Sequence, residues 1–299
     1  MRTVFHLSDL HFGRLNPATL EPLRATAHAI GPHVVAISGD LTQRARASQF
    51  RQAREYLDTL PKPQIVVPGN HDVPLYDVFS RFVRPLDNYR RYITEDLEPF
   101  FRDEEIAAIG INTARSLTFK GGRINERQVA RVRQRLCELP QTMASFIVTH
   151  HPFDLPEGHP PEDLVGRAQM AMETFVECGA DVILSGHLHV GHMGHTAVRY
   201  KIAGHSALVV QAGTATSTRE RGEPNSFNVL SVELPTITVT RYIWQPAKRD
   251  FEPAAAEIFR RVGFVWERVT APKPVEQAPA ASEEPPVTKV EPAATARAK

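Results

Sequence analysis

The sequence predicts an α/β fold in which a half of alternating strands and helices precedes a half made of strands. Up to about residue 190, short apolar runs alternate with helix-like stretches. After that point, apolar runs follow one another with brief connections and no helical stretch. Polar side chains that bind metals also recur at the ends of the apolar runs. At 299 residues the chain can form one large domain or two modest ones.

The first half supplies strands and helices in turn. Its apolar runs predict strands at residues 3–9, 33–40, 63–72, 104–113, 144–151 and 181–189. Helical periodicity, an early proline or a closing glycine predicts helices at residues 17–30, 48–60, 125–139 and 161–179. Residues 74–103 are rich in aromatics and arginines, and we expect them to form a helical excursion.

The second half predicts strands at residues 195–204, 207–216, 225–234 and 236–244. Large apolar side chains continue to Trp266, so residues 246–270 are expected to pack on the core as a closing segment. Residues 271–299 are rich in proline, alanine and charge, and cannot bury enough surface to offset the entropy of ordering. We therefore expect one main domain over residues 1–245, the closing segment, and a disordered tail.

The composition excludes several classes of protein. Hydrophobic residues make up 42% and charged residues 23%, as in ordinary globular proteins. A net charge of +1 gives no field that would attract nucleic acid or an anionic membrane. No apolar run approaches the about 20 residues of a membrane span, and no secretory signal is visible, so a cytoplasmic location is expected. Cys137 and Cys178 are interpreted as reduced core thiols.

Five expected strands end in side chains that bind metals. In open α/β sheets, ligand sites gather outside the carboxyl ends of the strands, so all five ends point to one place. Chance easily supplies one Asp-x-His, but not five such endings in succession. The candidate ligands are Asp9, His11, Asp40, Asn70, His150, His187 and His189.

The ligand types identify the kind of metal site. Carboxylate, imidazole and amide without thiolate suit two divalent metal ions such as Mn²⁺, Fe²⁺/Fe³⁺ or Zn²⁺. Seven ligands are too many for one ion and suit two, in which case one carboxylate must bridge. Two metals about 3.5–4 Å apart can activate a water and clamp the oxygens of a phosphoryl displacement.

The motifs resemble those of the calcineurin-like metallophosphoesterase superfamily, most closely its cyclic-nucleotide and glycerophosphodiester phosphodiesterase branch. The family order D-x-H, G-D, G-N-H-D, H-x-P, G-H-x-H is present as "DLH", "GD", "GNHD", "HHP" and "GHLH" within residues 9–189. The resemblance implies a four-layer α/β/β/α sandwich of two mixed sheets flanked by helices, with a dinuclear site at the carboxyl ends of the strands. The strand-rich half would supply the second sheet, and residues 74–103 would form a cap-like insertion.

Family roles can be assigned to individual positions of this chain. Asp9, His11 and His189 would hold one metal; Asn70, His150 and His187 would hold the other; Asp40 would bridge, together with a hydroxide. His150 or His151 could be the ligand, and the family's H-x-P pattern selects His150 through Pro152. His71 would lie over the substrate phosphate and assist the leaving oxygen, and Asp72 would orient its imidazole through a hydrogen bond.

Other residues are candidates for contact with substrate. Arg44 lies just past Asp40 and is expected to reach a phosphate or a base. His151 would face away or reach the substrate. Arg219 and Asn225 would lie near the mouth of the site if their hairpin folds over it, although a polar turn is an equally good reading. His192 and His195 are interpreted as hairpin residues without a ligand role.

The expected function is hydrolysis of a small phosphodiester, such as a cyclic nucleotide, by a metal-bridging hydroxide. A pyrophosphatase acting on a nucleotide-sugar lipid is an alternative, although the best-known enzymes of that type carry arginine at the position of His71. A nuclease of the superfamily would need a basic groove, which the net charge does not indicate. A scaffold without catalytic activity should have lost ligands, and all candidate positions are retained here. The motifs leave the native metal pair, the oligomeric state and the substrate open.

Overall fold

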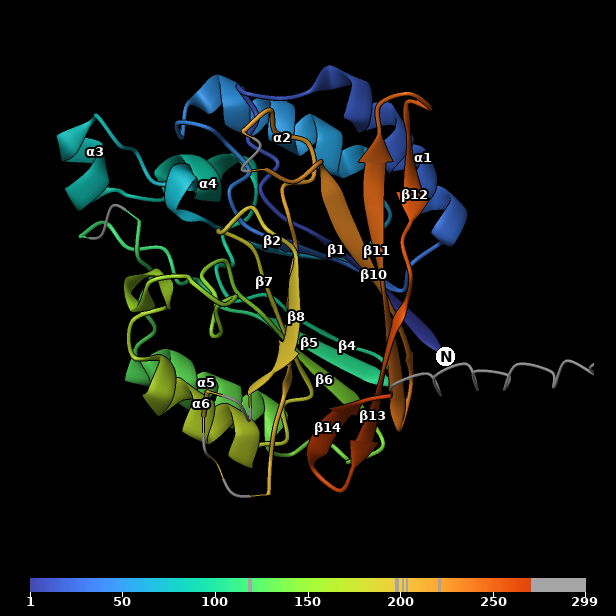
Figure 1. The fold of residues 1–299 in the computed structure, drawn as a ribbon. Coiled ribbons are helices and arrows are strands. Elements are labelled where there is room, and N and C mark those ends of the chain that lie inside the picture. Colours follow the sequence, from blue (N-terminus) through green and yellow to red (C-terminus); the bar gives the residue numbers. More distant parts are fainter. Residues whose placement is uncertain (118–119, 197–198, 201, 203, 220–221, 270–299) are drawn as a thin grey trace, which may run out of the picture. The chain divides into compact units, whose positions relative to one another are not determined.

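Apolar side chains on successive strand residues face opposite sides, and this alternation builds the layers of the fold. In β2 (Val34–Ser38), Val34 and Ala36 face one core, and Val35 and Ile37 face another. Both faces of the strand are therefore buried. Figure 1 shows the computed structural model, which describes residues 1–117, 120–196, 199–200, 202, 204–219 and 222–269. The tail expected from residue 271 onward lies outside the described residues.

The first sheet combines the beginning and the end of the described chain. Its path runs β14-β13-β11-β10-β1-β2-β3, and β12 pairs with β11. The strands β1, β2 and β3 are parallel neighbours, and β10 joins β1 in antiparallel register. The remaining strands are β1 (Arg2–Leu7), β3 (Gln64–Val67), β10 (Ser226–Glu233), β11 (Thr236–Gln245), β12 (Asp250–Pro253), β13 (Glu257–Val262) and β14 (Val265–Arg268).

The second sheet is formed by the middle of the chain, in the order β4-β5-β6-β7-β9-β8. The strands β5, β6, β7 and β9 are parallel, and the two edge strands are antiparallel to their neighbours. The members are β4 (Phe100–Arg102), β5 (Ile106–Gly110), β6 (Ala144–Val148), β7 (Val182–Ser185), β8 (His192–His195) and β9 (Leu208–Gln211).

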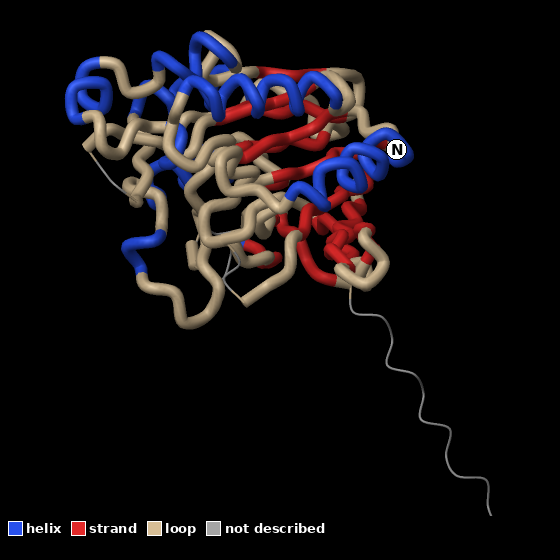
Figure 2. The backbone as a smooth tube through the Cα atoms, turned by 90° about the horizontal axis from the view of Figure 1, so that it is seen from above, coloured by secondary structure: helices blue, strands red, loops and turns tan. Residues whose placement is uncertain are grey.

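Helices cover the outer face of each sheet. The helices α1 (Leu20–Ile30), α2 (Ala47–Thr59) and α4 (Asp87–Tyr92) contribute to a core with the first sheet, and Figure 2 shows helices lying across its strands. The helices α5 (Glu126–Leu136) and α6 (Ala168–Glu177) cover the second sheet. A third core, containing Val4, Val67, Phe146 and Leu184, fills the space between the sheets. The fold is the four-layer α/β/β/α sandwich that the sequence predicts.

The strand-rich half was assigned to the wrong sheet. Only β8 and β9 join the second sheet, whereas β10 to β14 extend the first. The reason is the antiparallel register of β10 on β1, which closes the chain back onto its first strand. Of the closing segment expected at 246–270, residues 246–269 are described, and they enter the same sheet as β12, β13 and β14. Its Phe251, Phe259 and Trp266 are buried, while Phe264 is exposed.

Three other local expectations differ from the structure. Of the strand expected at 195–204, His195 is the end of β8, and Arg199 and Tyr200 form turns. Residues 197–198, 201 and 203 lie outside the described residues. The helix expected at 161–179 begins at Ala168, after a 3-10 turn at Pro161–Asp163. Residues 74–103 form α3 (Val78–Val83) and α4, and then end in β4.

The interpretation of the two cysteines as reduced thiols is wrong. Cys137 ends α5 and Cys178 ends α6, and the two sulfurs form a disulfide. The two helices lie side by side on the second sheet, which brings residues 41 positions apart in sequence together.

Candidate metal centre

The candidate ligands follow five strands, and the fold brings them to one edge of the two sheets. Asp9 and His11 follow β1, Asp40 follows β2 and Asn70 follows β3 in the first sheet. His150 follows β6, and His187 and His189 follow β7 in the second. The carboxyl ends of parallel strands meet at one edge, as the sequence predicts.

One group of ligand atoms comes from Asp9, His11, Asp40 and His189. These atoms all lie within 4.8 Å of one another, and all four residues are buried. Oδ1 of Asp9 lies 3.4 Å from Nε2 of His11 and 3.4 Å from Nε2 of His189. The group therefore presents two carboxylates and two imidazoles to one small volume.

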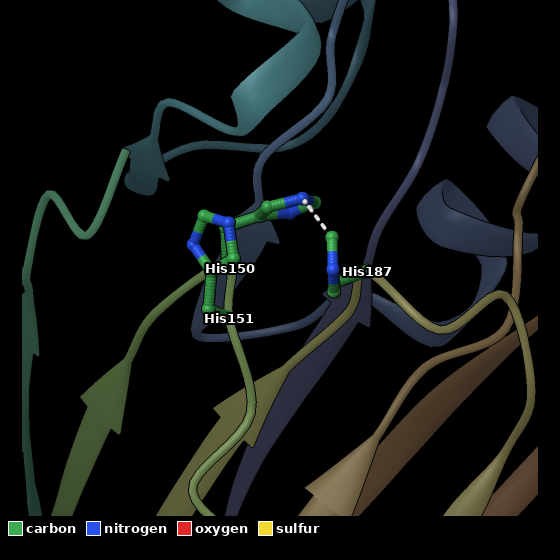
Figure 3. Close-up of side chains that lie close together, drawn as sticks. All are labelled: His150, His151 and His187. Carbon is green, nitrogen blue, oxygen red and sulfur yellow. Dashed lines mark hydrogen bonds between the residues drawn. The ribbon is translucent and has the colours of Figure 1, made fainter. Parts of the chain in front are cut away.

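A second group comes from Asn70, His150 and His187. Oδ1 of Asn70 lies 3.0 Å from Nε2 of His150 and 3.0 Å from Nδ1 of His187. The two histidine nitrogens are 3.3 Å apart, and Figure 3 shows the two imidazoles directed toward each other. The other nitrogen of His150 bonds to the carbonyl of Ser38 at 2.8 Å, which leaves Nε2 directed at the group.

Asp40 lies between the two groups. Its Oδ1 is 3.4 Å from Nε2 of His150, and its Oδ2 is 3.7 Å from Nε2 of His11. One carboxylate therefore faces a histidine of each group, as a bridging ligand must. Gly69 makes this approach possible, because a Cβ at that position would come within 2.1 Å of Oδ1 of Asp40.

The backbone at five candidate ligands adopts left-handed conformations. The φ angles are 55° at Asp9, 52° at His11, 52° at Asp40, 75° at His187 and 62° at His189. Non-glycine residues adopt positive φ only at a cost, and such strain clusters at functional sites. The loops are thus held in shapes that turn these side chains inward.

The donor chemistry of the two groups fits metal ions. Among the described residues, Oδ1 of Asp9 and both ring nitrogens of His11 are buried and make no hydrogen bond. Burial by itself raises the pKa of Asp9, but the imidazoles of His189 and His11 hold that pKa well below its usual range. Burial and the neighbouring His150 lower the pKa of His187 to about 3. Ionised carboxylates and neutral imidazoles are the forms that bind metals. The charges of Asp40 and Asp9 raise the pKa of His150 although burial lowers it, so a metal would compete with a proton there.

His151 lies near the second group but has no free nitrogen for a ligand role. Its Nδ1 lies 2.8 Å from Oγ1 of Thr113, and its Nε2 lies 2.9 Å from the carbonyl of Lys120. The side chain is fully buried, and its ring centroid lies 4.9 Å from that of His150 and 4.7 Å from that of His187 (Figure 3). The geometry does not support the expectation that His151 reaches substrate, because both nitrogens are already bonded within the protein.

Asp72 does not orient His71, which corrects the expectation from the sequence. The carboxylate of Asp72 accepts hydrogen bonds from the backbone N–H of Leu41, Thr42 and Gly69 at 3.1, 2.9 and 2.9 Å. It therefore joins the loop after β2 to the loop after β3. Burial and the charge of Asp40 raise the pKa of Asp72 to about 6.

His71 is oriented by a backbone carbonyl and an arginine. Its Nδ1 donates to the carbonyl of Gln43 at 3.0 Å, and its Nε2 accepts from Nη1 of Arg219 at 2.7 Å. Burial lowers the pKa of His71 despite the nearby Asp40 charge. The ring lies edge-on to His11, with centroids 4.9 Å apart, so His71 stands next to the first ligand group.

The remaining predicted contact residues have different surroundings. Arg44 lies over the ring of Tyr76, 5.3 Å from its centroid, and lines a pocket of about 510 Å³ with Phe79 and Arg84. Asn225 is fully buried, and its amide nitrogen bonds to the carbonyls of Thr214 and Ser217. A substrate cannot reach Asn225 there, so this expectation is corrected.

Sequence reasoning missed the residues that hold the ligand loops. Oγ of Ser8 donates to Oδ2 of Asp9 at 2.6 Å, and the hydroxyls of Thr214 and Thr216 bond to the loop after β1. The run "GTATST" directly after β9 is the signal that could have identified them, because short hydroxyl side chains readily bond to nearby backbone.

Comparisons with known proteins agree with this geometry. The profile of the family described as calcineurin-like phosphoesterase matches residues 2–191. Over 92 residues the chain is 29% identical to glycerophosphodiester phosphodiesterase GpdQ of Enterobacter lignolyticus, a match covering 27% of this chain and 32% of that protein. The match thus spans about a third of that relative's length.

Solved structures share the fold at low identity. Purple acid phosphatase PPD1 from yellow lupin matches 86% of this chain and 53% of its own, with a TM-score of 0.66 and 12% identity. A dimetal phosphatase from Danio rerio matches 80% of this chain and 95% of its own, with a TM-score of 0.58 and 13% identity. Among the described residues, no helix combines the length and apolarity that crossing a membrane requires.

Proposed function

The chain belongs to the calcineurin-like phosphoesterase family, and from this premise we propose that it hydrolyses a small phosphodiester at a dinuclear metal centre. A cyclic nucleotide or a glycerophosphodiester is the substrate class we propose. One observation carries the proposal: Asp40 faces a buried histidine of each of two ligand groups. Two bound divalent cations, Mn²⁺, Fe²⁺/Fe³⁺ or Zn²⁺, would supply water activation and neutralise the phosphate charge.

The protein's own residues would hold and orient the reactants. Asp9, His11 and His189 would bind one cation, Asn70, His150 and His187 the other, and Asp40 both. Because Nδ1 of His71 donates to Gln43, Nε2 is the atom that faces the site. In our proposal Nε2 of His71 contacts the leaving oxygen. Nε2 bears no proton while it accepts from Arg219, so the ring would first take up a proton from water at Nε2, forming the imidazolium, and would then donate that proton to the leaving oxygen.

The pocket beside the loop after β3 would receive the alcohol part of the diester. It is lined by Arg44, Tyr76, Phe79 and Arg84, and has a volume of about 510 Å³. Chain connectivity supports this placement, since Arg44 directly follows Gln43, whose carbonyl orients His71. Residues 74–103 would then act as the cap expected from the sequence.

A second candidate function is favoured by one specific observation. Exposed apolar side chains gather on or beside α3, namely those of Tyr76, Val78, Phe79, Phe82 and Val83, and two of them, Tyr76 and Phe79, line the same pocket. Contiguous exposed apolar side chains mark binding surfaces, and an acyl chain would cover them. Cleavage of the pyrophosphate of a nucleotide-sugar lipid is therefore the alternative.

A turnover panel with Mn²⁺-loaded protein tests the proposal. It compares bis(p-nitrophenyl) phosphate, cyclic AMP, glycerophosphodiesters, p-nitrophenyl phosphate and a UDP-sugar lipid. The proposal expects the small diesters to give the highest kcat/KM. Preference for the monoester would refute diester specificity, and preference for the UDP-sugar lipid would favour the alternative.

A further inference from the structure

The loop of residues 213–219 after β9 is fastened to the first ligand loop. Oγ1 of Thr214 donates to the carbonyl of Asp9 at 2.8 Å, and Oγ1 of Thr216 donates to the carbonyl of Leu10 at 2.7 Å. Both hydroxyls are buried. Because the partners are the backbone of a candidate ligand and its neighbour, the position of the loop is tied to the metal centre.

The same loop is held from its other side by Asn225. The amide nitrogen of Asn225 donates to the carbonyls of Thr214 and Ser217 at 3.2 and 2.8 Å. The backbone N–H of Arg219 in turn donates to Oγ of Ser217 at 3.0 Å. The loop thereby fixes the backbone position from which the Arg219 side chain extends.

From this loop the side chain of Arg219 reaches His71, which follows β3. Its Nη1 donates to Nε2 of His71 at 2.7 Å, although the two residues are 148 positions apart. An arginine carries five N–H donors in a planar fork that matches phosphate oxygens. A phosphate that contacts Nε2 of His71 would lie within reach of the same guanidinium.

We propose that Arg219 binds the phosphate oxygens of the substrate and positions His71, so that the loop of residues 213–219 supplies the phosphate-binding residue of the centre. The inference rests on the proposed function, since it takes a phosphoester as the ligand. The guanidinium transfers from Nε2 of His71 to the phosphate when substrate binds. That exchange frees Nε2 for the leaving oxygen only when a phosphate is in place.

The proposal predicts a specific loss of anion affinity. Hydrogen bonds to charged groups are stronger than neutral ones, so Arg219→Ala should weaken the binding of inorganic phosphate about 10–100-fold. Arg219→Lys keeps the positive charge but lacks the planar guanidinium, so its affinity for phosphate should lie between those of the unaltered protein and Arg219→Ala. Arg51→Ala, an exposed arginine on α2, is the matched control and should match the unaltered protein.

The experiment is calorimetric titration of Mn²⁺-loaded protein with inorganic phosphate, together with metal analysis of every variant. Kinetics on bis(p-nitrophenyl) phosphate adds a second readout, in which Arg219→Ala should raise KM and free guanidinium should restore part of the rate. A merely structural arginine would show no such rescue.

The outcomes separate this proposal from the proposed function. The role of Arg219 would be overturned if Arg219→Ala bound phosphate within twofold of the affinity of the unaltered protein. It would also be overturned if that variant lost metal, or if the unaltered protein bound no phosphate. If phosphate binding depends on Arg219 but no phosphodiester is turned over, the proposed function fails and the role of Arg219 stands.

Discussion

Oδ1 of Asp40 accepts a hydrogen bond from the backbone N–H of His71 at 2.8 Å. The same oxygen lies 3.4 Å from Nε2 of His150. The proposed bridging carboxylate thus contacts both the residue proposed to act on the leaving group and a ligand of the second group. Any change at Asp40 should therefore affect metal binding and the shape of the loop at His71 together.

Replacing the proposed bridge should remove both metal binding and activity. Asp40→Ala leaves two groups of imidazoles without the anion between them, so bound metal should fall below two ions per chain. Loss of a residue that only supports a ligand already costs about 10–100-fold, and loss of the bridge should cost more. Metal analysis and turnover of bis(p-nitrophenyl) phosphate measure both effects. Near-normal activity with two bound metals would show that Asp40 does not bridge.

Asp72→Ala should act on the loops rather than on proton transfer. Three backbone N–H groups would lose their acceptor in a buried site. The hydroxyl of Thr42 would keep only the carbonyl of His71 as an acceptor. Unsatisfied buried donors cost about 1–3 kcal/mol each, so the free energy of unfolding should drop by several kcal/mol. Metal content should drop as well, because Asp40 and Asn70 lie on the loops that Asp72 joins. Urea denaturation checks this, and a stable variant with two metals would contradict it.

The disulfide should contribute to stability without contributing to activity. Reduction, or the double change Cys137→Ser and Cys178→Ser, releases a loop closed over 41 positions. Such cross-links typically stabilise by about 2–4 kcal/mol, so Tm should fall. Metal content should stay at two ions, because the bond joins helix ends on the outer face of the second sheet. Thiol titration of unreduced protein is the control, and two free thiols would show that the bond is absent.

The sequence predicted that the candidate ligands lie together, because strand ends leave a clear local signal. Each apolar run ends in a polar side chain, and parallel strands bring those ends together. It could not predict the partners of His71, because Gln43 and Arg219 reach it through loops distant in the chain. It misassigned Asp72 and Asn225 for the same reason: both bond to backbone groups whose positions depend on the folded loops. The disulfide was missed because α5 and α6 had to be placed side by side first.

Asp154, which is not one of the candidate metal ligands, should make the stability of the protein depend on pH. Burial alone would raise the pKa of Asp154, but His192 and Arg199 lower it overall. A carboxylate whose pKa is lower in the folded state contributes to the free energy of unfolding at pH values above its unfolded-state pKa. This contribution is lost as the pH falls through the folded-state pKa. Asp154→Asn should therefore lower Tm at neutral pH, and the difference should vanish in acid. A Tm difference that stays constant down to acid pH would contradict this origin.

The last prediction separates the chemistry of His71 from metal binding. His71→Ala should keep both metals, because its ring nitrogens are bonded to Gln43 and Arg219 and not to the ligand groups. Assistance to a leaving oxygen is typically worth about 10²–10⁴-fold. The loss should reach that size for an alkoxide such as the ribose 3′-oxygen, which must gain a proton. It should be small for p-nitrophenolate, which leaves well without one.

Two rates and one metal analysis decide the role of His71. The rates are those of His71→Ala on cyclic AMP and on bis(p-nitrophenyl) phosphate, each compared with the unaltered protein. His71→Gln is the matched variant, since it retains a polar side chain and cannot supply a proton as imidazolium does. An equal drop on both substrates would identify His71 as a phosphate anchor. Loss of one metal would identify it as a ligand. Proton transfer at Nε2 is supported only if His71→Ala keeps both metals and its loss of rate grows with the basicity of the leaving oxygen.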